Sequence, residues 1–128
     1  HNMSKASDKL RVLGSRLIYG LSQIPESYLN GDAETRLPGN VNFSFDKTEG
    51  ETLVVLLDQM GICVSSGSAC AAGSLEPSHV LLSIGRSPEL AGASLRISLS
   101  EENTMEEVEY IIKSVREAVL RIRNVSSR

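Results

Sequence analysis

The 128-residue chain carries a net charge of −3, with 41% hydrophobic, 23% charged and 4% aromatic residues. This composition is ordinary for one globular domain, and a chain of this length can bury a core without disulfide or metal cross-links. A basic surface and stacking aromatic side chains are lacking, which disfavours nucleic-acid binding, and no apolar run approaches the roughly 20 residues of a membrane span.

The first and last residues of the chain are expected to lie outside the folded domain. Residues 1–3 are expected to be the remnant of an expression tag, residues 4–123 a single domain, and residues 124–128 a frayed polar tail. The chain shows no secretion signal, and Cys63 and Cys70 are too few for a disulfide scaffold. We therefore expect a cytoplasmic protein.

The first quarter of the chain predicts one helix and a connection. Apolar residues recur at three- and four-residue steps over residues 8–24, which is typical of an amphipathic helix. Ser7 or Asp8 is expected to cap its start and Pro25 to end it. Residues 26–39 are rich in turn-forming residues and predict a surface connection.

A strand and a buried helix are predicted next. Apolar and polar residues alternate over residues 41–45, which indicates a half-buried strand with Asn42 and Ser44 on its polar face. Residues 50–60 are apolar over most of a helical circumference, so this helix is expected to lie between layers. Gly61 suits the position that follows a helix.

A short apolar run, residues 62–65, predicts a strand that leads into an unusual loop. Cys63 in this strand is expected to be buried and inert, as free cysteines commonly are. Residues 65–74 then hold nine small residues and one thiol, Cys70, which is too little bulk to fill a core. We interpret the loop as a mobile arm with Cys70 as its reactive group. Ser74 completes the loop, and the other residues assigned to the mobile arm are Ser65, Ser66, Gly67, Ser68, Ala69, Ala71, Ala72 and Gly73.

The segment after the arm predicts a short helix over residues 77–85, a loop over residues 86–93 and a strand over residues 94–100. His79, early in the helix, is interpreted as a structural hydrogen-bonding residue. Arg96 falls in the middle of the strand on its polar face. It is either a solvated surface charge or a guanidinium placed to bind a carboxylate in a bidentate fashion.

The last predicted helix begins at a capping box formed by Thr104 and Glu107 and carries one apolar stripe to residue 122. The chain as a whole therefore predicts an α/β domain of two layers. Its sheet is expected to be small, mixed or antiparallel, with three or more short strands, and to be packed with about four helices.

The chemistry of Cys70 is only partly defined by these patterns. The spacing of Cys63 and Cys70 does not match a zinc site, so metal binding together with His79 is disfavoured. A papain-like protease would need a histidine with an orienting partner, and a phosphate-binding loop of the Walker type would need its lysine. Pattern alone indicates an α/β domain with an exposed functional cysteine, whose thiolate the nearby helix start could stabilise.

Residues 65–70 and 72–81 resemble the active-site loop of NifS/IscS-type cysteine desulfurases, which are pyridoxal-phosphate enzymes of the aminotransferase class V family. The resemblance extends from about residue 8 to residue 123 and implies the C-terminal small domain of such an enzyme. Further similar segments are residues 29–32, 41–45, 49–53 and 94–100.

This resemblance implies a role for two residues. Cys70 would be the nucleophile that takes sulfur from L-cysteine as a persulfide and leaves L-alanine, and Arg96 would bind the substrate carboxylate. The persulfide would pass to an iron–sulfur scaffold or a tRNA-thiolation protein. The full-length enzyme would be a homodimer, with neither nucleic acid nor membrane among its partners.

The sequence departs from the family in its lysines. The pyridoxal lysine of the family follows a histidine, whereas none of the four lysines here, Lys5, Lys9, Lys47 and Lys113, does so. We therefore expect this fragment alone to bind no pyridoxal phosphate and to lack desulfurase activity. Two alternatives stay open: a stand-alone persulfide carrier or docking module, and a fragment of a selenocysteine lyase.

Overall fold

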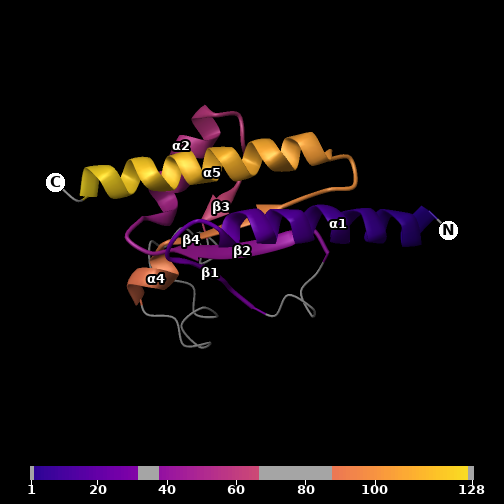
Figure 1. Ribbon diagram of the computed structural model, residues 1–128, viewed down its shortest axis with the longest axis horizontal. Coiled ribbons are helices and arrows are strands. Elements are labelled where there is room, and N and C mark those ends of the chain that lie inside the picture. Colours follow the sequence, from indigo (N-terminus) through magenta and orange to yellow (C-terminus); the bar gives the residue numbers. More distant parts are fainter. Residues whose placement is uncertain (1, 32–37, 67–87, 127–128) are drawn as a thin grey trace.

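The computed structural model describes residues 2–31, 38–66 and 88–126, which form an α/β fold of two layers (Figure 1). A four-stranded antiparallel sheet packs against helices, so the expected fold class is confirmed. The elements are α1 (Asn2–Ser22), β1 (Ser27–Leu29), β2 (Asn40–Phe45), α2 (Gly50–Gln59), β3 (Ser65–Ser66), α4 (Pro88–Gly92), β4 (Ser94–Ser98) and α5 (Met105–Ser126).

The sheet has the strand order β1-β2-β4-β3, and each neighbouring pair is antiparallel. Residues directly opposite each other on neighbouring strands point to the same face of a sheet. Phe43 lies opposite Leu95 on the apolar face, and Asn42 lies opposite Arg96 on the polar face. Ser65 of β3 lies opposite Arg96 from the other side.

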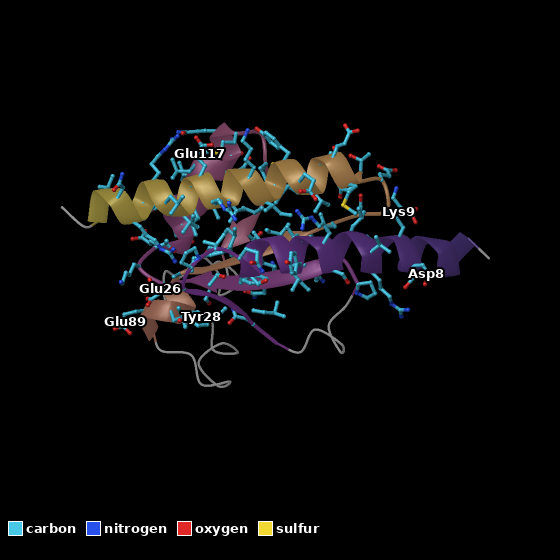
Figure 2. All side chains as sticks on the ribbon, in the orientation of Figure 1. Asp8, Lys9, Glu26, Tyr28, Glu89 and Glu117 are labelled. Carbon is cyan, nitrogen blue, oxygen red and sulfur yellow. The ribbon has the colours of Figure 1, made fainter. Side chains whose placement is uncertain are left out.

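The core lies between the apolar face of the sheet and the three long helices α1, α2 and α5. Apolar side chains fill this layer, while Asp8, Lys9 and Glu117 extend outward from the helices (Figure 2). Within the described ranges, no helix combines the length and apolar character that crossing a membrane requires. The largest fully buried side chains are Phe43, Phe45, Leu17, Leu21, Ile24, Leu53, Leu57, Leu95, Val41, Val108, Val115 and Val119.

Helices α1 and α5 run side by side in the same direction (Figure 1). A Cβ atom at Gly20 would overlap the Ile112 side chain, so glycine favours the close approach of the two helices there. Both nitrogens of the Arg16 fork bind the Glu109 carboxylate, with 2.8 Å between Nη2 and Oε1. This hydrogen bonding holds the pKa of Glu109 below its usual range.

The start of α5 is the predicted capping box. The Thr104 hydroxyl accepts a hydrogen bond from the Glu107 amide at 3.1 Å, and a Glu107 carboxylate oxygen accepts one from the Thr104 amide at 2.8 Å. Two backbone donors at the helix start are thereby satisfied. The bond from the Thr104 amide is the main cause that lowers the pKa of Glu107 below 4.5.

Replacing Thr104 with alanine is expected to lower the free energy of unfolding by about 1 kcal/mol, the usual cost of a lost helix cap. Because the pKa of Glu107 is lowered in the fold, its contribution is present above pH 4.5 and is lost as the pH falls through the folded pKa. Urea titrations of the wild type, Thr104→Ala and Glu107→Gln over a range of pH measure the stability of the cap and its dependence on the charge of Glu107. An unchanged midpoint for Thr104→Ala at pH 7 would contradict the capping assignment.

Helix α1 is longer than predicted. It begins at Asn2, so the expected caps Ser7 and Asp8 lie inside the helix instead of at its start. The residues before them include neither proline nor glycine, and nothing in that segment opposes helix formation. The helix ends at Ser22, three residues before Pro25.

Helix α5 continues through Ser126 and so includes the first three residues of the expected frayed tail. Its last turns are held by Arg123, whose guanidinium donates to the backbone carbonyls of Asp46 at 3.0 Å and Glu26 at 3.2 Å. These carbonyls belong to the turns that follow β2 and precede β1. Arg123 therefore binds two connections of the sheet to the last helix.

Two short elements were predicted as loops. Strand β1 lies within the stretch read as a surface connection, and helix α4 lies within the stretch read as the loop 86–93. Three residues of strand and five of helix are too short to show a hydrophobic period. Pro88 at the first position of α4 is nevertheless a known helix-start signal, because proline lacks an amide hydrogen that would go unpaired there.

The strand predicted over residues 62–65 is wrong in position, and the burial expected for Cys63 is wrong. In the described segment that ends at Ser66, pairing with the sheet is limited to Ser65 and Ser66, and Cys63 is an exposed free thiol. Gly61 ends α2 with φ +84°, and the Ile62 amide bonds back to the Leu57 carbonyl at 2.9 Å. Because Ile62 takes the buried position, the next residue faces solvent.

Candidate active site

Arg96 lies at the centre of a polar row that crosses three strands. Asn42 of β2 and Ser65 of β3 are its directly opposite neighbours, and such pairs have Cβ atoms roughly 4.5–5.5 Å apart. The long helices all cover the other face of the sheet, and the Arg96 side chain is exposed. A guanidinium on a paired strand has a fixed base and open access to a carboxylate.

The base of the predicted arm is anchored to the start of α2. The Ser66 hydroxyl donates to a Glu51 carboxylate oxygen at 2.8 Å. A Cβ atom at Gly50 would lie 2.6 Å from the Ser94 carbonyl oxygen, so glycine lets the helix start approach β4 closely. These contacts fix the point at which the chain leaves β3 beside Arg96.

Most of the arm lies outside the described residues. Ser65 and Ser66 form β3 as part of the sheet. The remaining predicted residues, together with His79 and the helix expected over residues 77–85, are not described. The undescribed arm residues are Gly67, Ser68, Ala69, Cys70, Ala71, Ala72 and Gly73.

The buried side-chain amide of Asn30 donates hydrogen bonds to the polar face of β2. Asn30 is 7% exposed, and its side-chain amide nitrogen donates to Oδ1 of Asn42 at 3.0 Å and to the Ser44 hydroxyl at 2.9 Å. Its backbone amide also donates to the Asn42 carbonyl at 2.8 Å. Asn30 lies in the stretch predicted as a surface connection, since asparagine before glycine is a common turn signal, and this local signal does not predict its burial.

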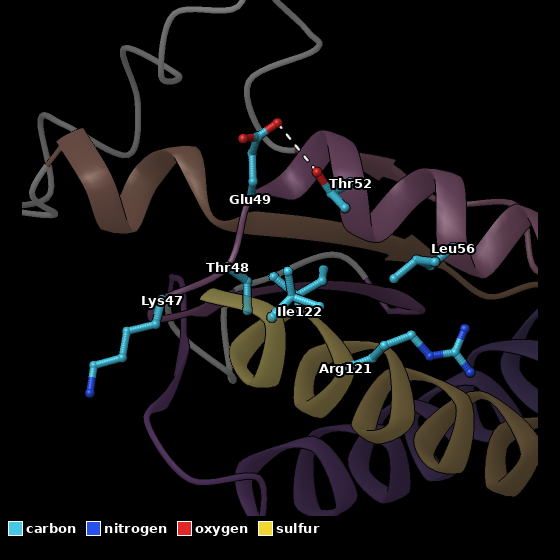
Figure 3. Close-up of a pocket in the computed structure, with 8 residues that line it drawn as sticks. Lys47, Thr48, Glu49, Thr52, Leu56, Arg121 and Ile122 are labelled. Carbon is cyan, nitrogen blue, oxygen red and sulfur yellow. Dashed lines mark hydrogen bonds between the residues drawn. The ribbon is translucent and has the colours of Figure 1, made fainter. Parts of the chain in front are cut away.

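A pocket of about 710 Å³ lies between α2 and the end of α5 (Figure 3). Lys47 and Arg121, its two basic lining residues, point away from each other, and the Thr52 hydroxyl lies 3.4 Å from Glu49. The pocket belongs to the helical layer, on the opposite side of the sheet from Arg96. Its polar groups do not converge on a ligand.

The described residues do not fit pyridoxal phosphate. A lysine that forms a Schiff base is normally desolvated, which favours its neutral amine. The described lysine side chains, Lys9, Lys47 and Lys113, are all exposed, and the Lys47 ammonium lies 3.5 Å from a Glu26 carboxylate oxygen. In the described part of the chain, no three metal-ligating side chains of histidine, cysteine, aspartate or glutamate cluster together.

The chain belongs to the aminotransferase class-V family, whose profile matches residues 1–111. Curated relatives include cysteine desulfurase IscS of Clostridium botulinum, which is 50% identical over 128 residues, and cysteine desulfurase IscS of Methanosarcina thermophila, which is 45% identical over 124 residues. These alignments cover 98% and 97% of this chain, but only 32% and 31% of the relatives.

Solved structures show the same relationship. A NifS-like protein from Rickettsia africae superposes with a TM-score of 0.79 at 31% identity, over 91% of this chain and 30% of that protein. A second NifS-like protein superposes with a TM-score of 0.76 at 32% identity, over 91% of this chain and 29% of that protein. The chain thus spans about a third of the length of the relatives it matches.

Proposed function

We propose that this chain is the C-terminal, sulfur-accepting part of a cysteine desulfurase. Cys70 is the nucleophile and Arg96 the residue that binds the substrate carboxylate. The 50% identity to a curated cysteine desulfurase supports this reaction class, and the similarity extends over nearly the whole chain. The parent enzyme's pyridoxal phosphate is held outside this chain, in accord with the exposed side chains of the described lysines, Lys9, Lys47 and Lys113.

The register of β3 against β4 is the observation that carries the proposal. It sets Ser65 beside Arg96, and Ser66 then starts the segment toward Cys70, four residues further on. At about 3.5 Å per residue, four residues of extended chain span at most about 14 Å. This short connection is compatible with a thiol and a guanidinium that act on the same substrate, and it supports the proposal.

The proposed reaction moves one sulfur atom. The Cys70 thiolate forms a bond to the sulfur of L-cysteine, and the carbon–sulfur bond breaks with its electron pair left on the substrate carbon. Protonation of that carbon gives L-alanine, and Cys70 holds a persulfide. Pyridoxal phosphate, bound by the parent enzyme, supplies the electron sink that makes this carbon–sulfur cleavage feasible.

We also propose the sulfur acceptor, the compartment and the oligomeric state of the parent enzyme. The persulfide passes to an iron–sulfur scaffold or a tRNA-thiolation protein in the cytoplasm, and the parent enzyme is a homodimer. The chain alone is inactive, because none of the described lysines, Lys9, Lys47 and Lys113, is suited to the cofactor.

Purified full-length protein should release alanine from L-cysteine. Absence of that activity in cofactor-loaded full-length protein would overturn the proposal.

Replacing Arg96 with alanine in the full-length protein is expected to raise the KM for L-cysteine by about 10-fold to 100-fold, because a bidentate bond to a charged group is lost. The absorbance band of bound pyridoxal phosphate should be unchanged. Arg11→Ala, which removes an exposed arginine of α1, is the matched control and should keep the wild-type KM. Loss of the cofactor band in Arg96→Ala would assign Arg96 a different role.

A further inference from the structure

The side-chain amide of Asn42 is oriented by its neighbour in the sheet. Its oxygen accepts a hydrogen bond from the buried Asn30 amide at 3.0 Å. Because that oxygen faces Asn30, the NH₂ group of Asn42 points elsewhere and keeps both hydrogens for other partners. Within the described residues, the NH₂ group has no hydrogen-bond acceptor.

Asn42 and Arg96 form a pair of donors on one face. They are directly opposite residues of β2 and β4, so their side chains start about 5 Å apart and leave the sheet in the same direction. Asn42 is half-buried and Arg96 is exposed, which sets the amide nearer the sheet and the guanidinium nearer solvent. Neither side chain has an acidic neighbour across the row, since the third member is Ser65.

A carboxylate can use both donors at once. Its two oxygens offer about four lone-pair sites, of which the planar fork of one arginine takes two. A further donor that is already held in place adds a bond at little cost in side-chain entropy. The Asn30–Asn42 hydrogen bond provides this preorganisation.

We propose that the Asn42 NH₂ group is a second donor to the α-carboxylate of the amino-acid substrate, alongside Arg96. This inference rests on the proposed function and deepens it, because it assigns a residue that sets the preference for substrates with a free carboxylate. Asn42 binds the same group as Arg96 from the neighbouring strand.

Asn42→Ala and Ser44→Ala in the full-length protein form a matched pair, because each removes one acceptor that the described residues offer to the Asn30 amide. Only Asn42→Ala also removes the donor beside Arg96. We expect Asn42→Ala to raise the KM for L-cysteine roughly 10-fold or more, the effect of one lost hydrogen bond to a charged group. Ser44→Ala should keep KM within about two-fold of the wild type.

The readouts are KM, kcat, the pyridoxal band and the urea midpoint of each variant. Equal changes of KM in Asn42→Ala and Ser44→Ala would show a purely structural role for Asn42 and overturn the inference. A raised KM in Arg96→Ala with an unchanged KM in Asn42→Ala would overturn it as well, while leaving the proposed function intact. Failure of the wild type to turn over L-cysteine would instead overturn the proposed function.

Discussion

Replacing Cys70 with serine in the full-length protein is expected to reduce alanine formation from L-cysteine by at least about 1000-fold. A serine hydroxyl is not ionised near neutral pH and has no adjacent base in the proposed scheme, so it cannot replace a thiolate as nucleophile. The effect should fall on kcat, because substrate binding by Arg96 is untouched. Single-turnover measurement of alanine, with mass spectrometry of the protein to detect the added sulfur, separates these steps.

Cys63→Ser is the matched control for this experiment. Cys63 is exposed in the connection before β3, and it is the other cysteine of the chain. Its replacement should leave alanine formation and the persulfide intact. A persulfide on Cys63, or a fully active Cys70→Ser variant, would show that the nucleophile is misassigned.

Regular and long elements could be predicted from sequence because their patterns depend on local periodicity. The alternation over residues 41–45 indicated β2, and the stripe after Thr104 indicated α5 with its capping box. In both elements, one face is apolar and buried, so apolar residues repeat in the sequence with the period of the strand or helix. The alternation in β4 likewise placed Arg96 on the polar face.

Other features depend on contacts between distant segments, which periodicity does not record. Strand β1 is identified by its pairing with β2 and by the buried Asn30, and neither leaves a pattern in three residues. Cys63 was expected to be buried on the statistics of free cysteines, but the turn at Gly61 directs Ile62 inward and leaves Cys63 in solvent. The short helix α4 was missed for the same reason as β1.

Part of the candidate site could be predicted from local sequence signals, and part of it depends on contacts between distant segments. The arm and Arg96 could be proposed from the sequence, because small residues around a thiol and an arginine in mid-strand are local signals. The row formed by Asn42, Arg96 and Ser65 could not be proposed, since it depends on the register of three strands. Alternation gives the face of each residue but not the residue opposite it.

Replacing Phe43 with alanine is expected to lower the free energy of unfolding by about 3–5 kcal/mol, the range for truncating a buried phenylalanine. Phe43 is 1% exposed on the apolar face of β2, where it stacks on Phe45 with ring centroids 5.9 Å apart. Truncation removes a buried ring and leaves a cavity between the sheet and the helices. A domain stabilised by some 5–15 kcal/mol would lose a large part of its stability.

Urea denaturation of Phe43→Ala, Phe43→Leu and Val55→Ala measures this effect and its origin. Val55 is 56% exposed on α2, so its truncation should change the free energy by less than about 0.5 kcal/mol. Phe43→Leu should fall between the wild type and alanine, because the loss grows with the volume left empty. Equal losses for Phe43→Ala and Val55→Ala would contradict a core centred on β2. Because Phe43 lies opposite Leu95, the residue before Arg96, the same ring also supports the strand that carries the proposed carboxylate-binding residue.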